Sequence, residues 1–359
     1  MPFSPTLRCA CPVPHFLRRS LLKGIAGLGG AALAGGCASS ATNSAAIVKN
    51  RIDTHHHLFS PAYVRELEKV NQAPPIVRNW SVARTLEDMD KAGVATSILS
   101  VTTPHVQFIP ATDREAARRI ARESNEWVAK LGAAHPRKFG SFAMLPLQHT
   151  DDALAEITYA LDTLKADGIC LLTSYGDKWL GHASFEPVMA ELNRRNAILY
   201  THPTAANCCR NLQPDVPPTV VEFGTDTTRT IVDFVFSGFA ARYPKIRPIF
   251  SHAGGTLPFL TERLIKMPVL DPKLGARVPN GVLHELQRFY YDTAWSTHPG
   301  ALASLLKLVK PSQVLFGSDY PYRTGEDHVK GLAEYGFSAD DLAAIGRGNA
   351  VRLMPQWQV

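Results

Sequence analysis

Three consecutive histidines, His55-His56-His57, follow a short apolar lead that ends at Ile52. If this lead is a β-strand, its side chains alternate between two faces, so that His55 and His57 point one way and His56 the other. Neutral imidazole is a suitable ligand for Zn²⁺ and similar divalent ions, and the two-residue spacing brings two ring nitrogens toward one ion. The pattern therefore predicts part of a metal site, with a polar loop as the alternative when the pair is taken alone.

Three further apolar runs end in residues of the same chemistry. They end in Thr201-His202-Pro203, in Ser251-His252-Ala253 and in Gly317-Ser318-Asp319. Each has an ordinary explanation when taken alone, because His-Pro is common in turns and Ser-Asp in helix caps. Taken together with the first pair, they predict a cluster of three ligand histidines, one carboxylate and one spare histidine.

The elements that would position these residues alternate between strand and helix. Short apolar, β-branched or aromatic runs predict eight strands, at 52–54, 96–101, 139–144, 168–172, 198–201, 248–251, 289–293 and 314–317. Helical periodicity occurs between them, at 82–92, 114–134, 152–166, 185–195 and 227–242. This alternation implies a parallel sheet and favours a single α/β domain over residues 50–359, a (β/α)₈ TIM barrel with its site at the carboxyl ends of the strands.

An open, doubly wound sheet is the structural alternative. Its nucleotide-binding versions need a glycine-rich phosphate cradle. Neither Gly-x-Gly-x-x-Gly after the first strand nor Gly-x-x-x-x-Gly-Lys-Ser/Thr anywhere is present. The barrel is therefore the favoured architecture.

From Arg51 onward the chain resembles the amidohydrolase-related family, in particular its branch of aminocarboxymuconate-semialdehyde, γ-resorcylate and 6-methylsalicylate type decarboxylases. Besides the histidine and aspartate motifs, the resemblance rests on Asn125-Glu126-Trp127, His135-Pro136-Arg137-Lys138-Phe139-Gly140, Leu145-Pro146-Leu147, Ala166-Asp167-Gly168, Asp226-Thr227-Thr228-Arg229 and His252-Ala253-Gly254-Gly255-Thr256-Leu257-Pro258. The methylsalicylate-decarboxylase-like group is the nearest branch.

The resemblance implies one divalent ion, Zn²⁺ or alternatively Mn²⁺, held by His55, His57, His202 and Asp319. It places His252 beside the ion as an acid/base residue, with Asp319 as a second catalytic group, and it implies no organic cofactor. The chemistry of the residues agrees, because three neutral imidazoles and one carboxylate leave a site of net charge +1 with room for water or substrate. A histidine outside the ligand set can transfer protons near neutral pH.

The fourth predicted strand separates subclasses of this family. The resemblance implies that its two-metal hydrolases carry a carbamylated lysine at the end of that strand. Here the strand ends in Leu172-Thr173-Ser174, and Lys178 lies several residues further on. A single-metal site follows.

A decarboxylase also needs a group that holds the substrate carboxylate. Arg78, between the first two strands and near where the resemblance places a substrate-binding arginine, is the first candidate. Arg229 is the second, with an ordinary ion pair to Asp226 as its alternative role. His105, in the loop after the second strand, is a candidate for the pocket lining. Tyr320 and Tyr322 would either line the site or simply pack, and Asp292 would orient His252 or a water molecule from outside the ligand set.

The first 49 residues read as a targeting segment with a short linker. They contain Arg18-Arg19-Ser20-Leu21-Leu22-Lys23, which resembles a twin-arginine export signal, followed by a Gly/Ala-rich apolar run at 24–33 and no acidic residue. The stretch before Cys37 resembles a lipoprotein box, with a small-residue cleavage site as the alternative. We expect export through the twin-arginine machinery to the periplasm, with Cys37 as the candidate lipid anchor and the sole link to a membrane.

Net charge and cysteine content limit the partners. Removing the four basic residues of positions 1–36 lowers the formal charge from +6 to +2, and no basic-aromatic array follows, so no nucleic-acid partner is expected. Only Cys170, Cys208 and Cys209 remain in the folded part, which is no disulfide framework, and a loop role is favoured for the adjacent pair. A homodimer is compatible with the family resemblance, although no interface motif is evident.

Three functions are compatible with these residues. The first is a metal-dependent, non-oxidative decarboxylase of a small aromatic or unsaturated carboxylic acid, such as a hydroxybenzoate or 6-methylsalicylate. The second is a mononuclear metal-dependent hydrolase, of lactonase or esterase/amidase type, in which His252 activates a metal-bound water. The third is an exported metal- or ligand-binding lipoprotein without catalysis, against which the intact set of histidines and Asp319 argues.

Overall fold

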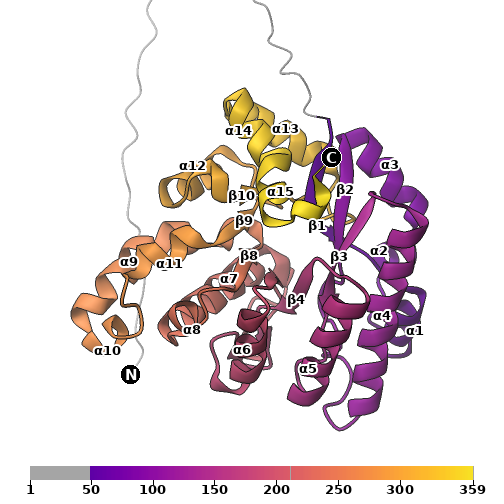
Figure 1. The fold of residues 1–359 in the computed structure, drawn as a ribbon, viewed down its shortest axis with the longest axis horizontal. Coiled ribbons are helices and arrows are strands. Elements are labelled where there is room, and N and C mark those ends of the chain that lie inside the picture. Colours follow the sequence, from indigo (N-terminus) through magenta and orange to yellow (C-terminus); the bar gives the residue numbers. More distant parts are fainter. Residues whose placement is uncertain (1–48, 211, 359) are drawn as a thin grey trace, which may run out of the picture. The chain divides into compact units, whose positions relative to one another are not determined.

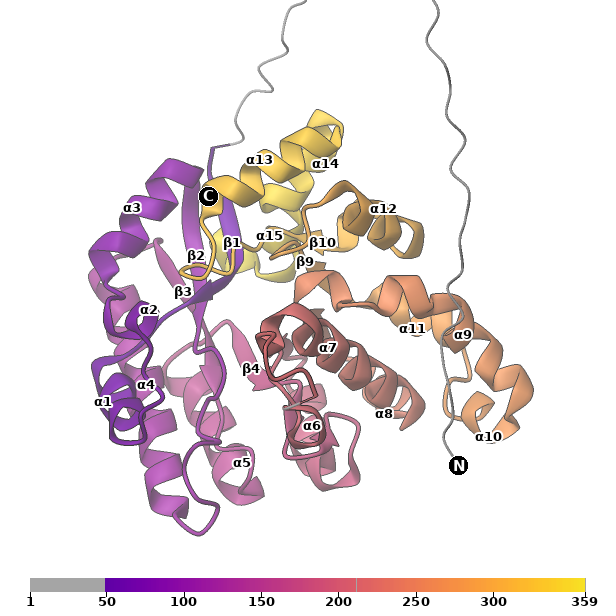
Figure 2. The same ribbon diagram turned by 180° about the vertical axis from the view of Figure 1, so that it is seen from behind.

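Eight parallel strands form one sheet, in the order β1-β2-β3-β4-β7-β8-β9-β10. Their bounds are β1 (Arg51–His57), β2 (Val94–Ser100), β3 (Phe139–Met144), β4 (Gly168–Leu172), β7 (Ile198–His202), β8 (Arg247–Phe250), β9 (Tyr290–Asp292) and β10 (Val314–Leu315). The computed structural model describes residues 49–210 and 212–358. Each strand coincides with a predicted one, and helices surround them (Figures 1 and 2), so the predicted (β/α)₈ barrel is confirmed.

The helices lie between and after the strands. They are α1 (Pro61–Lys69), α2 (Pro75–Arg78), α3 (Val82–Ala92), α4 (Arg114–Ala134), α5 (Thr150–Thr158), α6 (Glu186–Arg194), α7 (Pro218–Phe236), α8 (Phe239–Arg242), α9 (Leu257–Leu270), α10 (Pro272–Gly275), α11 (Val282–Arg288), α12 (Pro299–Leu308), α13 (Gly325–Tyr335), α14 (Ala339–Ala343) and α15 (Asn349–Leu353). A small antiparallel hairpin, β5 (Ser174–Tyr175) and β6 (Lys178–Trp179), follows β4.

Local capping explains why some helices have the predicted ends. The Ser81 side chain accepts a hydrogen bond from the backbone of Arg84 at the start of α3, and Gly93 ends this helix in a left-handed conformation with φ of 64°. Asp113 caps α4 in the same way, through the backbone of Ala116. Both helices match the predicted ranges 82–92 and 114–134.

Two other predicted helices differ from the structure. Helix α7 begins at Pro218, nine residues before the predicted start. Proline suits the first helical position, because its φ is already helical and it has no N–H that would be left unpaired there. Gly238, with φ of 84°, separates α7 from α8. Helix α5 ends at Thr158 and continues as a π-helical turn over Tyr159–Thr163, short of the predicted residue 166.

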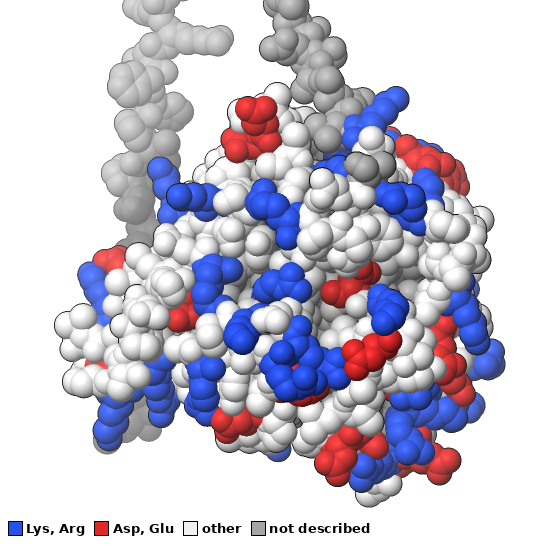
Figure 3. Space-filling model, in the orientation of Figure 1, with Lys and Arg blue, Asp and Glu red and all other residues white. Residues whose placement is uncertain are grey.

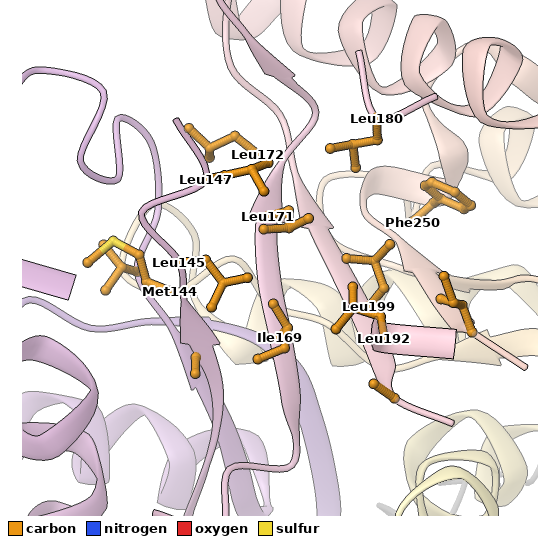
Figure 4. Packing of buried hydrophobic residues seen from close by; sticks show 14 of the residues in the cluster. Met144, Leu145, Leu147, Ile169, Leu171, Leu172, Leu180, Leu192, Leu199 and Phe250 are labelled. Atoms are coloured by element: carbon orange, nitrogen blue, oxygen red, sulfur yellow. The ribbon is translucent and has the colours of Figure 1, made fainter. Parts of the chain in front are cut away.

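Alternation along the strands divides the core into two parts. Figure 4 shows Ile169 and Leu171 of β4 with Leu199 of β7 in the larger cluster, which lies between the sheet and the helices. The intervening Cys170 and Tyr200 belong to a second cluster together with residues of the other strands. That second cluster fills the barrel with Ile52, Ile98, Phe142, Cys170, Ile198, Tyr200, Ile249 and Leu315, and Leu353 and Met354 close it from the C-terminal segment.

The barrel is closed by a seam between β1 and the residues that follow β10. Backbone bonds join Thr54 N to Phe316 O at 2.9 Å, Asp319 N to His55 O at 2.8 Å and His57 N to Tyr320 O at 2.7 Å. The segment is irregular here, because Asp319 adopts a left-handed φ of 60°. Regular strand pairing is therefore replaced by a few specific hydrogen bonds at this seam.

The buried carboxylate of Asp53 fastens this seam. It accepts hydrogen bonds from the backbone N–H and the hydroxyl of Ser318, at 3.1 and 2.5 Å. It also accepts from the backbone of His55 and from Nδ1 of His56, both at 3.0 Å. One carboxylate thus connects the ends of the first and last strands.

Charged side chains of both signs are interspersed on the face shown in Figure 3. Many form exposed pairs within one helix, such as Lys266 with Glu262 at 2.6 Å and Lys91 with Glu87 at 2.7 Å. Exposed pairs of this kind contribute little to stability. Among the described helices, none has the length and apolar character needed to cross a bilayer.

The predicted export segment, including Arg18, Arg19 and Cys37, lies outside the described residues, which begin at Lys49. Within them, Cys208 and Cys209 form a disulfide between neighbouring residues, and Cys170 is a buried free thiol. The pair lies in a short turn after β7, and its bond, which the sequence did not predict, joins neighbouring residues and is not a disulfide framework.

Replacing Asp53 with alanine leaves the backbone donors of Ser318 and His55 unpaired in the barrel wall. The Ser318 hydroxyl and Nδ1 of His56 keep only long contacts, at 3.5 Å to the carbonyl of His55 and 3.4 Å to Oγ of Ser97. Because each buried donor without a partner costs roughly 1–3 kcal/mol, we expect the free energy of unfolding of metal-free protein to fall by about 3 kcal/mol or more. Urea denaturation measures it. Asp90→Ala is the matched control, since Asp90 is exposed and lies 3.6 Å from Lys138, and it should change stability by less than about 0.5 kcal/mol. Equal losses in the two variants would contradict the role of Asp53.

Candidate metal centre

Four buried side chains converge at the carboxyl ends of the strands. His55 and His57 come from the end of β1, His202 from the end of β7, and Asp319 from the turn after β10. One ligand atom from each lies within 4.8 Å of those of the other three. Gly317 permits this approach, because a Cβ there would lie 2.8 Å from Cβ of His55. The structure thus brings together all four predicted metal ligands.

In each of the three ligand histidines, the hydrogen bond made by Nδ1 determines that Nε2 faces the metal site. Nδ1 of His55 lies 2.9 Å from Oδ2 of Asp292, Nδ1 of His57 lies 3.2 Å from the carbonyl of Ser100, and Nδ1 of His202 lies 2.9 Å from the carbonyl of Pro203. These oxygens only accept, so each Nδ1 carries a hydrogen and donates it. The three Nε2 atoms are therefore left to bind an ion, as histidine ligands of metals commonly are.

The inner atoms fit a divalent cation. Nε2 of His55 and Nε2 of His57 lie 3.2 Å apart, and Oδ1 of Asp319 lies 3.2 and 2.7 Å from them. This carboxylate oxygen is buried and has no hydrogen-bond donor among the described residues. Three imidazole nitrogens and an unpaired carboxylate oxygen directed at one point are the donor set of a catalytic zinc-type site.

The electrostatics of the cluster also demand positive charge. Burial lowers the pKa of His57, and burial together with the neighbouring His57 and His55 lowers that of His202 well below its usual range. Burial acts in the same direction on His55, but Asp292 and Asp319 outweigh it and raise the pKa of His55 to about 10. Burial would raise the pKa of Asp319, yet His55 and the other histidines hold it well below its usual range. A proton and a metal ion therefore compete for Nε2 of His55.

Asp292 links the ligand set to His252. Its Oδ2 accepts from His55, while its Oδ1 accepts from the backbone N–H groups of His252 and Ala294, each at 3.0 Å. The sequence placed Asp292 outside the ligands as an orienting residue for His252. It does hold His252, but through the backbone, and it orients the ring of His55 as well.

His252 lies beside the ligand set and outside it. Its backbone is left-handed, with φ of 54°, and its side chain remains 12% exposed. Nε2 lies 3.5 Å from Oδ2 of Asp319, and Nδ1 has no hydrogen-bond partner among the described residues. The ring is thus held near the centre with one nitrogen free, as a proton-transfer group requires.

The end of β4 carries no lysine. Thr173 and Ser174 instead donate their hydroxyl hydrogens to Oδ2 of Asp226, at 2.5 and 2.8 Å. Lys178 lies in β6 and is exposed. The arrangement agrees with a single-metal site.

The two predicted carboxylate-binding arginines are not brought to the ligands by any contact. Arg78 is the exposed last residue of α2, and its side chain forms no hydrogen bond or ion pair with the described residues. Arg229 lies 3.6 Å from Glu222 and 6.0 Å from the ring of Trp179. The alternative pairing with Asp226 is also absent, because Thr173, Ser174 and Trp179 occupy that carboxylate.

His105 is buried in the barrel wall. Its Nε2 lies 2.9 Å from the carbonyl of Val101 and 3.5 Å from Sγ of Cys170, whose side chain belongs to the core inside the barrel. Burial lowers the pKa of His105 to about 3, so the ring is neutral. These contacts favour a structural role, and the predicted pocket-lining role of His105 stays a prediction.

The residues around the ligands divide by face, as the alternation along β1 predicts. The ring of His56 turns away from the metal ligands and stacks on Tyr320 with centroids 4.8 Å apart. Tyr322 instead lies with its ring 5.8 Å from that of His57. Sequence reasoning overlooked Asp53, because its partner Ser318 is distant in the chain and the strand is irregular between Asp53 and His56, so simple alternation does not place its side chain.

The comparisons with known proteins agree with this geometry. The model of the amidohydrolase family matches residues 52–355. Decarboxylase macB of Penicillium terrestre is 36% identical over 327 residues, which cover 86% of this chain and 96% of that protein. The 6-methylsalicylic acid decarboxylase of Penicillium expansum is 34% identical over 314 residues, which cover 85% of this chain and 96% of that protein.

A solved structure, that of 2,6-dihydroxybenzoate decarboxylase in complex with 2,6-dihydroxybenzoate, has the same fold. It matches with a TM-score of 0.76 and 23% identity, covering 86% of this chain and 99% of that one. With the family model extending from the first strand to the C-terminal segment, the chain belongs to the amidohydrolase family.

Proposed function

We propose that this protein is a metal-dependent, non-oxidative decarboxylase of a small aromatic carboxylic acid with a neighbouring hydroxyl group. The observation that carries the proposal is the single-metal His₃Asp cluster with His252 beside it and no lysine at the end of β4. The relatives named as decarboxylases, one of them for 6-methylsalicylic acid, support the same reaction and the same substrate class.

The reaction requires one bond to break and one proton to move. The bond between the ring carbon and the carboxylate breaks, CO₂ leaves, and the electron pair remains on the ring carbon until a proton reaches it. A divalent ion bound by the four ligands would supply a Lewis acid for the hydroxyl and carboxylate oxygens of the substrate. His252 delivers the proton, and Asp319, 3.5 Å from its Nε2, orients its ring.

The donor set suits more than one ion. Three imidazoles and a carboxylate are common ligands of Zn²⁺, and Mn²⁺ accepts the same nitrogen and oxygen donors. We propose Zn²⁺ as the resident ion, with Mn²⁺ as the alternative. We also keep three proposed substrate-binding residues: Arg78, Arg229 and His105. The proposal for them rests on the sequence, because no contact joins them to the metal ligands.

Localisation and assembly are separate proposals. We propose export by the twin-arginine machinery to the periplasm, supported by Arg18-Arg19 and the apolar run that follows, and attachment to a membrane only through a lipid at Cys37. A homodimer is proposed from the family resemblance alone. Export, lipid attachment and dimerisation would each leave the chemistry of the metal centre unchanged.

Purified, metal-loaded protein should release CO₂ from 6-methylsalicylate or another 2-hydroxybenzoate, with about one metal ion per chain. Gas release and elemental analysis measure both quantities. A fully metallated protein that releases no CO₂ but hydrolyses a lactone, ester or amide would contradict the proposal and favour the hydrolase. Inactivity on both panels would favour the non-catalytic binding protein.

Two histidine substitutions should separate catalysis from metal binding. His252→Ala should lower kcat about 10²–10⁴-fold and keep the metal, because a general acid is lost while the four ligands remain. His202→Ala should lose both metal and activity. His284→Ala, at an exposed position of α11, is the control and should lose neither. Full activity in His252→Ala would refute its assignment.

The lipid anchor predicts a fractionation result. The full-length protein, expressed in a bacterium with a twin-arginine system, should sediment with membranes, and Cys37→Ser should move it to the soluble fraction. Immunoblotting of the two fractions measures the distribution. Wild-type protein found entirely in the soluble periplasmic fraction would exclude anchoring through Cys37.

A further inference from the structure

Two exposed aromatic side chains closely follow metal-centre residues in the chain. Of the aromatic residues that the structure describes, three are exposed: Phe259 at 86%, Trp295 at 54% and Tyr322 at 37%. Trp295 follows Asp292 by three residues, and Tyr322 follows Asp319 by three. Three residues of chain span at most about 11 Å, so both aromatics start close to the site.

The fold presents Trp295 to solvent at an energetic cost. Its backbone has φ of 52°, a left-handed conformation that is unusual and strained for a bulky side chain. The backbone N–H of Trp295 donates to Nε2 of His328 at 2.9 Å. The buried His328 in turn donates from Nδ1 to the carbonyl of Thr324. Residues on both sides of Trp295, Ala294 and Ser296, are buried. The surroundings thus fix an outward-facing indole.

A cation lies against this indole. The guanidinium carbon of Arg323 is 4.8 Å from the ring centroid of Trp295. The backbone N–H of Arg323 also bonds to the carbonyl of the ligand Asp319, at 3.3 Å. Its side chain is 40% exposed and pairs with Asp327 at 3.3 Å. An exposed pair of this kind is weak, so another carboxylate can replace Asp327 at little cost.

A continuous set of contacts connects this pair to the metal ligands. Tyr322 has its ring edge-on to that of His57, with centroids 5.8 Å apart, and is followed directly by Arg323, which lies over Trp295. By contrast, neither Arg78 nor Arg229 directly contacts a metal ligand, although Nη1 of Arg229, 3.6 Å from Glu222, is buried without a hydrogen-bond partner among the described residues. Arg323 is therefore the arginine that the geometry ties most directly to the metal centre.

We propose that Trp295, Arg323 and Tyr322 form the recognition surface for the aromatic acid that the metal centre acts on. The substrate ring packs against the indole of Trp295 and the phenol of Tyr322, and its carboxylate accepts hydrogen bonds from Arg323. The identity of the acid rests on the proposed function, but the recognition itself does not require turnover. Flat aromatic anions should therefore bind better than aliphatic ones.

Equilibrium binding of unreactive probes to the full-length, metal-loaded protein tests this surface. Benzoate and cyclohexanecarboxylate carry the same charge, but only benzoate has a flat ring. We expect Trp295→Ala to weaken benzoate binding about tenfold and cyclohexanecarboxylate binding much less, while Trp295→Phe keeps most of the affinity. Arg323→Gln should weaken both acids about tenfold, and Arg323→Lys should recover part of the loss. Calorimetry measures the dissociation constants.

Matched controls and independent readouts separate recognition from folding and from catalysis. Phe259→Ala and Arg263→Gln, on the exposed surface of α9, should bind both acids as the wild type does, and metal content and thermal midpoint should be equal in all variants. Benzoate should quench indole fluorescence in the wild type and much less in Trp295→Phe.

Wild-type benzoate affinity in both Trp295→Ala and Arg323→Gln would overturn the inference even if CO₂ is released. Weakened binding without CO₂ release from any hydroxybenzoate would instead support recognition and refute the decarboxylase.

Discussion

The metal centre depends on the seam where the barrel closes. His55, His57 and Asp319, three of the four ligands, come from the two sides of this seam, between β1 and the residues after β10. Strand pairing is irregular there, and the carboxylate of Asp53 joins the two sides through the backbone and hydroxyl of Ser318. The ligands on the two sides of the seam reach their positions only if the barrel closes in one register. The contacts that close the barrel therefore also assemble the metal site.

The second constraint is the charge balance within a buried site. Four imidazole rings and two carboxylates, those of Asp292 and Asp319, share a region with almost no solvent. Asp319 remains ionised because His55 and its neighbours hold its pKa well below the usual range despite burial. Asp292 connects the ring of His55 to the backbone of His252, so the geometry of the ligand and of the proton-transfer group is set by one carboxylate. The ion and the acid/base residue are thus positioned together.

Much of the fold and of the ligand set could be predicted from the sequence. Strands have a strong local pattern of apolar and β-branched residues, and all eight lie where expected. The four ligands follow strand ends, and the carboxyl ends of parallel strands in a barrel must converge. The early start of α7 was missed, because it depends on Pro218 rather than on apolar periodicity, and the pairing of Arg229 with Glu222 instead of Asp226 depends on what else contacts Asp226.

The sequence by itself therefore determined the barrel, the four ligand residues and the placement of His252 as a fifth polar group near them. Local periodicity and strand-end chemistry are properties of short stretches, and they are readable without the fold. Only the tertiary structure decided that Asp53 fastens the seam, that Asp292 serves His55 and His252 together, and that Trp295 lies against Arg323. These pairs join residues that are distant in the chain, and their contacts exist only after the helices and strands have packed in one register. Sequence patterns identify the residues that can do chemistry, and tertiary packing determines which of them are in contact.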